Sequence, residues 1–147
     1  MKLQRVFFDA TVWISALISP SGLNGFILSI AGQKAFITLT SSSIQGEVSR
    51  WISRQKKQLE LSNHQVFFQH KIQPESIDLV ESDLQPWTEI PETDRHVIAG
   101  AVKGNADVLV SDNIRHLNKP AAKRAIPHIL TPLEFIVWFR KLEDKKP

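Results

Sequence analysis

Short apolar runs alternate with helically spaced apolar stretches along this chain. The residues from Leu3 to Phe8 are nearly all apolar and β-prone, as in a strand that is buried on both faces. Further short runs predict strands at 35–39, 107–110 and 128–130. Between these runs, apolar residues three and four positions apart predict helices. The predicted helices cover residues 11–18, 24–31, 42–52, 64–72, 75–84, 94–103 and 131–140, with a short extended segment at 87–90.

Local signals mark where two of these helices begin. Ser42 and Gln45 have the spacing of a capping box, and so do Thr131 and Glu134. Because strands and helices alternate in this way, we expect an α/β domain with a largely parallel sheet.

The composition narrows the class of protein. A length of 147 residues is that of one domain, so we expect a single domain over residues 1–141 and a basic tail over 142–147. The absence of cysteine excludes disulfides and thiolate metal sites. No apolar run reaches the roughly 18 residues of a membrane helix, and the first residues lack the apolar segment of a secretory signal. We therefore expect a cytoplasmic protein that does not enter a membrane.

Three acidic residues stand where the predicted elements should bring their side chains together. Asp9 directly follows the first strand, and Asp112 comes two residues after the strand at 107–110. Asp94 lies on the apolar, inward stripe of the helix at 94–103. The carboxyl ends of parallel strands meet at one edge of a sheet, so we expect these acids to lie close together.

Each acid also has a purely structural interpretation. Asp9 could cap the next helix, Asp94 could favour the dipole of its own helix, and Asp112 could belong to a turn. Glu47 lies about 85° from the centre of its helix's apolar stripe, where it could reach a cleft or pair with Arg50. Two strand ends and an inward helix position at one edge favour a common site.

Such a site indicates metal-assisted chemistry on phosphodiesters. Carboxylates are costly to bury unless they hold a positive group, and Mg²⁺ and Mn²⁺ prefer oxygen ligands. Asn113 could supply a further neutral oxygen, while Thr11 and Ser111 could donate hydrogen bonds to the ligating carboxylates. Like charges in one pocket should also raise the pKa of at least one acid. His96 and His116 are near in sequence, but His96 falls roughly 200° around the helix from Asp94 and is interpreted as a surface or structural residue.

Basic residues concentrate beside the proposed acids. The net charge is only +3, with a pI near 9.3. Two clusters follow Glu47 and Asp112, and their members are Arg50, Arg54, Lys56 and Lys57, then Arg115, Lys119, Lys123 and Arg124. A polyanion at the acids would need this counter-charge. Two solvated faces would have the same pattern, and charge alone favours that interpretation.

Four segments, taken in order, resemble the motifs of PIN domains. Residues 7–17 resemble the opening motif. In that motif an Asp comes after a run of apolar residues, and further apolar residues and Ser-Ala come after the Asp. Gly46-Glu47-Val48 resembles the second motif, 94–101 the third and 106–117 the fourth. Residues 131–135 resemble the closing segment of this group. Each motif alone is weak, but the ordered set spans nearly the whole chain.

The resemblance implies a fold and an activity. PIN domains are three-layer α/β/α sandwiches with a central, mainly parallel sheet, and most characterised bacterial members are Mg²⁺- or Mn²⁺-dependent ribonucleases. The PIN family includes the VapC-like and PilT N-terminus-like groups. Many VapC-like proteins are toxins of toxin–antitoxin pairs. The resemblance places Asp9, Glu47 and Asp94 in the three main acidic positions.

The expected substrate and partners follow from the same resemblance. We expect an endoribonuclease whose RNA contacts Arg50, Arg54 and Arg115. We also expect a homodimer and an antitoxin that covers the acidic cleft.

The chain departs from the family pattern in its supporting positions. Thr11 stands where Asn is common, and His116 stands where a further acid is frequent. Asn113 aligns with a position often held by Asp, so either Asp112 or Asn113 could be the fourth ligand. Charge favours Asp112 and register favours Asn113, and we expect Asp112 to contribute.

Two other functions fit parts of the sequence. Residues 9–12 resemble the first motif of haloacid-dehalogenase-type phosphatases, but the second Asp of that motif is replaced by Thr11. A PIN-like module with a weakened fourth position could also bind RNA or a partner protein without cleaving.

Overall fold

The computed structural model describes residues 2–146 and centres on a five-stranded sheet whose strands pair in parallel. The strands are β1 (Arg5–Phe8), β2 (Ile37–Ser41), β3 (Glu75–Ile77), β4 (Val108–Val110) and β5 (His128–Leu130). Their spatial order is β3-β2-β1-β4-β5, so β1 is central and all five carboxyl ends lie at one edge. Residues 1 and 147, at the outer ends of the predicted domain and tail, lie outside the described residues.

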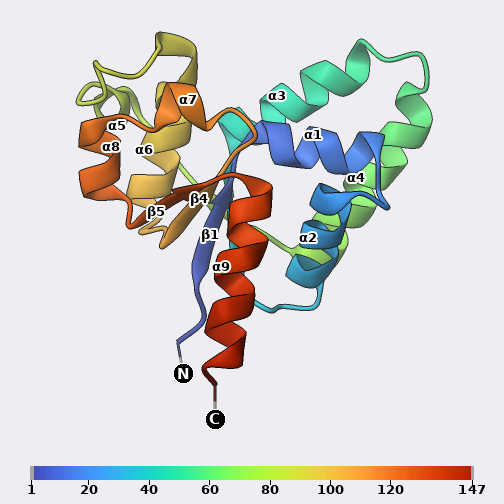
Figure 1. Cartoon of the computed structure of the whole chain (residues 1–147). Helices are drawn as coiled ribbons and strands as arrows, with labels where there is room; N and C mark the ends of the chain where they lie inside the picture. Colours follow the sequence, from blue (N-terminus) through green and yellow to red (C-terminus); the bar gives the residue numbers. More distant parts are fainter. Residues whose placement is uncertain (1, 147) are drawn as a thin grey trace.

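Helices cover both faces of this sheet. They are α1 (Ala10–Ile18), α2 (Leu23–Gly32), α3 (Ser42–Ser53), α4 (Gln58–Ile72), α5 (Glu81–Leu84), α6 (Arg95–Lys103), α7 (Ile114–Leu117), α8 (Pro120–Ala125) and α9 (Pro132–Asp144), with a 3₁₀ turn η1 (Glu92–Asp94) before α6. Figure 1 shows α5, α6 and α8 to one side of the sheet and α1, α2 and α4 to the other. The predicted α/β fold with a parallel sheet is confirmed.

Within residues 2–146 no single helix is long and apolar enough to cross a membrane. Helices α1 and α2 meet that length and composition only together, across a bend of 106°.

Two neighbouring phenylalanines of β1 place the core on both faces of the sheet. Side chains alternate along a strand, so Phe7 and Phe8 point to opposite faces, and both are fully buried. Phe8 packs edge-on against Trp13, Phe36 and Phe135, with ring centroids 6.5, 5.8 and 6.1 Å away. Phe7 packs against α6. Each buried ring contributes roughly 1.5–3 kcal/mol, so β1 is held from both sides.

The segment at 75–84, predicted as one helix, is instead the edge strand β3 followed by the short helix α5. β3 pairs with β2, and Glu75 lies opposite Leu39. Its side chains are exposed except for the partly buried Ile77, so no apolar alternation marks it as a strand. Residues 87–90, predicted to be extended, form turns.

Helix α4 begins at Gln58, six residues before the predicted start at position 64. Its only buried residue is Ile72, at the C-terminal end. Leu59 is 76% exposed, so the first turns have no apolar stripe to reveal them.

The two predicted caps have different outcomes. The cap of α3 is Ser41 rather than Ser42, and its hydroxyl accepts a hydrogen bond from the backbone N–H of Ile44 at 3.2 Å. The capping box of α9 is confirmed, with Thr131 and Glu134 bonded reciprocally at 2.9 and 3.2 Å. Helix α9 continues to Asp144, beyond the predicted end of the domain at 141.

The variant Gly100→Ala should destabilise the fold, although alanine is the better helix former. A Cβ at Gly100 would lie 2.6 Å from Cζ of the buried Phe7, and such overpacking costs about 1–3 kcal/mol. Gly46→Ala in α3 is the matched control. Its nearest neighbour is the flexible Nη1 of Arg50 at 3.3 Å, so alanine there should gain up to about 1 kcal/mol. Urea unfolding followed by circular dichroism measures both, and equal stabilities would contradict this close packing of α6 on β1.

Candidate active site

Asp9 follows the central strand at the N-cap position of α1 and is only 7% exposed. Its Oδ1 accepts a hydrogen bond from the N–H of Ala10 at 2.7 Å. Its Oδ2 accepts from the hydroxyls of Ser111 at 2.6 Å and Thr11 at 3.3 Å. The N-cap interpretation is therefore confirmed, and the same carboxylate is joined to the end of β4 through Ser111.

The two hydroxyls tie Asp9 to the loop after β4. The Thr11 hydroxyl accepts from the N–H of Asp112 at 3.1 Å, and the Ser111 hydroxyl accepts from the N–H of Asn113 at 2.9 Å. A hydroxyl has one proton to donate, and both donate it to Asp9. The carboxylate is thus oriented from two strand ends at once.

Burial raises the pKa of the Asp9 carboxyl above its ordinary value, against the lowering effect of the hydrogen bonds from Ser111, Ala10 and Thr11. The negative charge of Glu47 raises this pKa further. The expected rise in the pKa of one acid is confirmed in direction. Its main cause is burial rather than the like charge.

Glu47 reaches this edge of the sheet from α3, and its side chain is 36% exposed. Its Oε1 lies 2.5 Å from Nε2 of His96 on α6, a side chain that is only 12% exposed. Of the two interpretations of His96, surface or structural, the surface one is therefore wrong. Asp94 ends η1 and His96 lies in the first turn of α6, so the rotation of a regular α-helix does not relate them.

Asp94 occupies the N-cap position of α6, and its side chain is 26% exposed. Its Oδ2 lies 3.4 Å from Nδ1 of His116 on α7. Each of these two outer acids, Glu47 and Asp94, thus has a histidine beside it.

No group of three or more His, Asp or Glu side chains within residues 2–146 is arranged closely enough to hold a metal ion. The expected convergence of Asp9, Glu47 and Asp94 on one cation is therefore absent from this arrangement. Asp9 accepts hydrogen bonds from donors in its own turn and from Ser111 after β4. The other two acids turn to their histidines.

The donor chemistry nevertheless fits a hard divalent cation. Asp9 is a buried carboxylate, and the negative charge of Glu47 repels its charged form. A cation beside these oxygens would offset both the lost solvation and the repulsion. Carboxylates of this kind are the ligands that Mg²⁺ and Mn²⁺ prefer.

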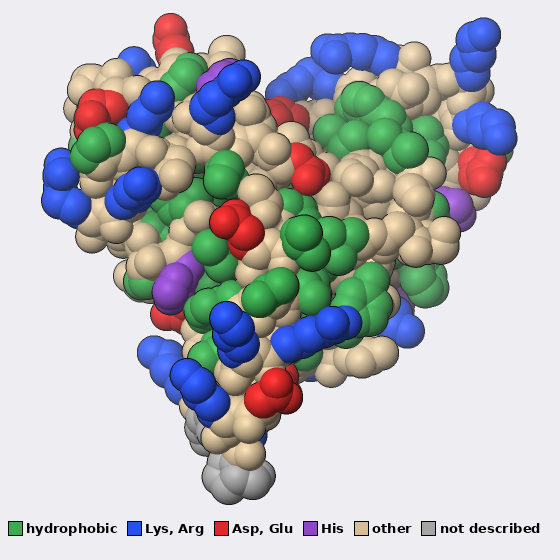
Figure 2. Space-filling model, viewed as in Figure 1, with side chains coloured by type: hydrophobic (Ala, Val, Ile, Leu, Met, Phe, Trp, Pro, Cys, Tyr) green, Lys and Arg blue, Asp and Glu red, His purple; other side chains and the backbone are tan. Residues whose placement is uncertain are grey.

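A cavity of about 640 Å³ opens where α1, α3 and the start of α6 meet. Glu47, Asp94 and His96 line it together with Arg50 and Arg54. Figure 2 shows the hollow between the lobes of α3 and α7, with basic side chains along its rim. Anionic and cationic groups therefore share one cavity, as the binding of a phosphodiester beside a cation requires.

Comparison with known proteins gives the family. The family model described as PIN domain matches residues 5–115. This chain belongs to the PIN-domain family. The match includes all four of the acids predicted from the sequence.

Solved structures agree with this fold. A chain of VapBC2 from Rickettsia felis, in a crystal bound to a DNA fragment from the promoter, matches with a TM-score of 0.64 and 20% identity, covering 86% of this chain and 97% of that one. A chain of DNA-bound VapBC from Salmonella typhimurium matches with a TM-score of 0.65 and 13% identity, covering 88% and 99%. No curated protein matches the chain by sequence.

The two candidate ligands in the fourth PIN motif, Asp112 and Asn113, have different neighbours. Asp112 is exposed, and its Oδ2 accepts a hydrogen bond from Nδ2 of Asn24 at 3.1 Å. The amide of Asn113 lies 3.3 Å from Nδ1 of His116. The two side chains therefore point to different partners, Asp112 toward α2 and Asn113 toward α7.

Asn24 is a site residue that the sequence interpretation missed. It is only 6% exposed, and its Oδ1 is buried without a hydrogen-bond partner within residues 2–146. Its spacing to Ile27, Leu28 and Ala31 is the same i, i+3, i+4, i+7 pattern that singled out Asp94. A polar residue on a buried stripe was the available signal.

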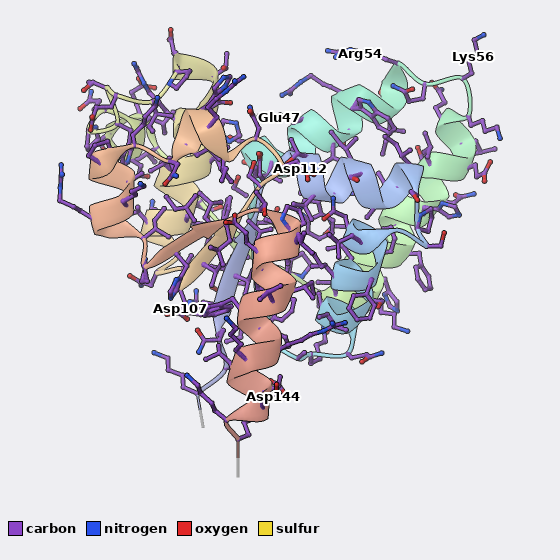
Figure 3. The ribbon with its side chains drawn as sticks, viewed as in Figure 1. Glu47, Arg54, Lys56, Asp107, Asp112 and Asp144 are labelled. Carbon is purple, nitrogen blue, oxygen red and sulfur yellow. The ribbon has the colours of Figure 1, made fainter. Side chains whose placement is uncertain are left out.

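The two basic clusters lie differently relative to this PIN site. Arg50 and Arg54 line the cavity of the acids. Arg115 is exposed on the short helix α7, which also carries His116. Figure 3 shows Glu47 and Asp112 together at the carboxyl edge of the sheet, and Asp144 at the opposite end of the molecule.

Asp9→Asn should make the protein more stable at neutral pH. The pKa of Asp9 is raised in the folded state, so protonation of this carboxyl stabilises the fold. The stabilisation is complete below the ordinary pKa of 3.8 and is lost as the pH rises through the raised pKa. The variant removes this ionisation, and each kcal/mol gained raises Tm by roughly 2–4 °C in a domain of this size.

Thermal unfolding from pH 7 down to pH 3 tests this prediction. The advantage of Asp9→Asn should shrink on acidification, because the parent then regains its proton. The exposed Asp144→Asn serves as the control and should show no such pH-dependent gain. A parent that is the more stable protein at pH 7 would refute the account.

Proposed function

We propose that this PIN domain is a metal-dependent endoribonuclease that hydrolyses RNA phosphodiester bonds. The observation that carries the proposal is the buried Asp9 carboxylate at the end of the central strand, with the charge of Glu47 acting on it. Two anionic groups held in this way favour a cation between them. Membership of the PIN family supports the same conclusion, since such domains are typically nucleases.

The acidic residues of the site would bind the metal ion. Asp9, Glu47 and Asp94 would hold Mg²⁺ or Mn²⁺, with Asp112 or Asn113 completing the ligand set. The cation supplies Lewis acidity, which neutralises charge on the phosphodiester and activates water.

Supporting residues would orient those ligands and the substrate. Ser111 and Thr11 fix the direction of the Asp9 carboxylate through their hydroxyls. Arg50 and Arg54 offer positive charge to the RNA backbone within the same cavity. Arg115, exposed on α7, would contact the RNA from the other rim.

We further propose that the chain is the toxin of a type II toxin–antitoxin pair. The solved structures that match it are described as VapBC complexes bound to DNA. A homodimer and an antitoxin that covers the acidic cavity are the corresponding partners.

A second candidate is a PIN module that binds RNA or a protein without cleaving it. The observation in its favour is the fourth motif, where Asn113 replaces a common Asp and Asp112 is engaged by Asn24. A neutral amide offers a divalent cation less charge than a carboxylate does, so this position would bind metal more weakly.

The parent protein should cleave single-stranded RNA in Mg²⁺ or Mn²⁺, and EDTA should abolish cleavage. Asp9→Asn and Glu47→Gln should each lose at least about 100-fold in rate, more than the 10–100-fold typical of residues that only support a metal ligand. Asp144→Asn, at the far end of α9, is the matched control and should keep full activity (Figure 3). Cleavage that persists in Asp9→Asn or in EDTA would reject the mechanism.

Manganese binding should separate Asp112 from Asn113. We expect Asp112→Ala to weaken Mn²⁺ binding more than Asn113→Ala does, because a carboxylate attracts a divalent cation more strongly than an amide. Electron paramagnetic resonance of free Mn²⁺ measures this without RNA. If Asp112→Ala binds Mn²⁺ as tightly as the parent while Asn113→Ala does not, the preference for Asp112 is wrong.

A further inference from the structure

A second cavity lies beside the cavity at the acids, at the far end of α3. This second cavity has a volume of about 800 Å³ and lies between the ends of α1 and α3 and the start of α4. Trp51 and Arg54 line both cavities. A chain-like molecule that occupied both would therefore pass directly across these two side chains.

The charge of the walls changes along this path. Glu47 and Asp94 lie at the inner end, where a cation is expected. At the outer end, Arg54 is joined by Lys56 and Lys57, and Glu60 is the acid among the lining residues. Figure 3 shows Arg54 at the end of α3 and Lys56 beyond it, leading away from Glu47. A polyanion that extends out of the site fits this gradient better than a small phosphate.

Trp51 has the properties of a stacking platform. Its indole is half-buried and packs against the core, so its position is fixed, and it forms part of the wall of both cavities. Unpaired bases stack on such aromatic faces in single-strand binding grooves, whatever their sequence. In a duplex both faces of each base are covered, so only a single strand can use this contact.

We propose that the two cavities form one trough for single-stranded RNA. One base stacks on Trp51, and successive backbone phosphates contact Arg54, Lys56 and Lys57. This inference rests on the proposed function, because it gives the path by which substrate leaves the acids. A peptide segment could also use apolar walls such as Ile18, but the surplus of cations favours the nucleic acid.

Binding measured in EDTA tests the stacking contact apart from catalysis. Fluorescence anisotropy of a labelled oligouridylate should show about 5- to 100-fold weaker binding by Trp51→Leu. Trp51→Phe keeps an aromatic face and should restore most of the affinity. Phe67→Leu removes a 58% exposed aromatic side chain of α4 outside the trough and should bind like the parent.

The salt dependence of the same binding tests the phosphate contacts. Lys56→Gln and Lys57→Gln should each reduce the slope of log K against log salt by roughly 0.7, the value for one single-strand phosphate contact. Lys141→Gln, on the exposed side of α9, should leave the slope unchanged. Neither lysine of the pair belongs to the core, so these variants test the trough even if Trp51→Leu unfolds.

Two results would overturn the trough. One is parent-like affinity of Trp51→Leu together with parent-like salt slopes of both lysine variants. The other is trough variants that lose binding of an acidic peptide but keep binding of RNA. A parent that binds RNA through the trough but never cleaves it would reject the proposed nuclease and support the trough. Cleaving parent enzyme with unaffected trough variants would reject the trough alone.

Discussion

The buried carboxylate of Asp9 is the constraint on which the arrangement of the site depends. It stands at the carboxyl end of the central strand, caps α1, and is joined to β4 by the hydroxyl of Ser111. A carboxylate in this position is destabilising unless donors surround it, and burial raises its pKa in spite of three such donors. The junction of β1, α1 and β4 is thus built around one charge that destabilises the fold.

Further charged and titratable side chains surround the Asp9 carboxylate. Glu47 adds a second negative group, and its charge acts on Asp9. Each outer acid has a histidine within reach, and two arginines share the cavity. Acidic and basic side chains that line one cavity are typical of a site that binds a charged ligand.

The packing that stabilises the fold lies on the two faces of the sheet, whereas the candidate site lies at its carboxyl edge. Phe7 and Phe8 anchor β1 from opposite sides, so the central strand that ends at Asp9 is rigid. The elements that carry the outer acids are less constrained: Glu47 is on a helix face at the edge of the core, and Asp94 ends a short 3₁₀ turn. The proposed metal ligands would therefore combine one carboxylate at the end of a rigid strand with two carboxylates on elements at the edge of the core.

Apolar periodicity and the order of the motifs were enough to predict the parallel α/β fold, the position of Asp9 and Asp112 at strand ends, and the family, because both are properties of the linear sequence. It could not reveal β3, whose side chains are exposed, or the first turns of α4, which bury nothing. The contact of His96 with Glu47 and that of Asn24 with Asp112 arise only in the folded chain. The same holds for the absence, within residues 2–146, of a cluster of acids close enough to hold a metal ion. Those contacts join residues 49 and 88 positions apart, and which side chains meet across such separations depends on how helices pack, not on any pattern within one helix.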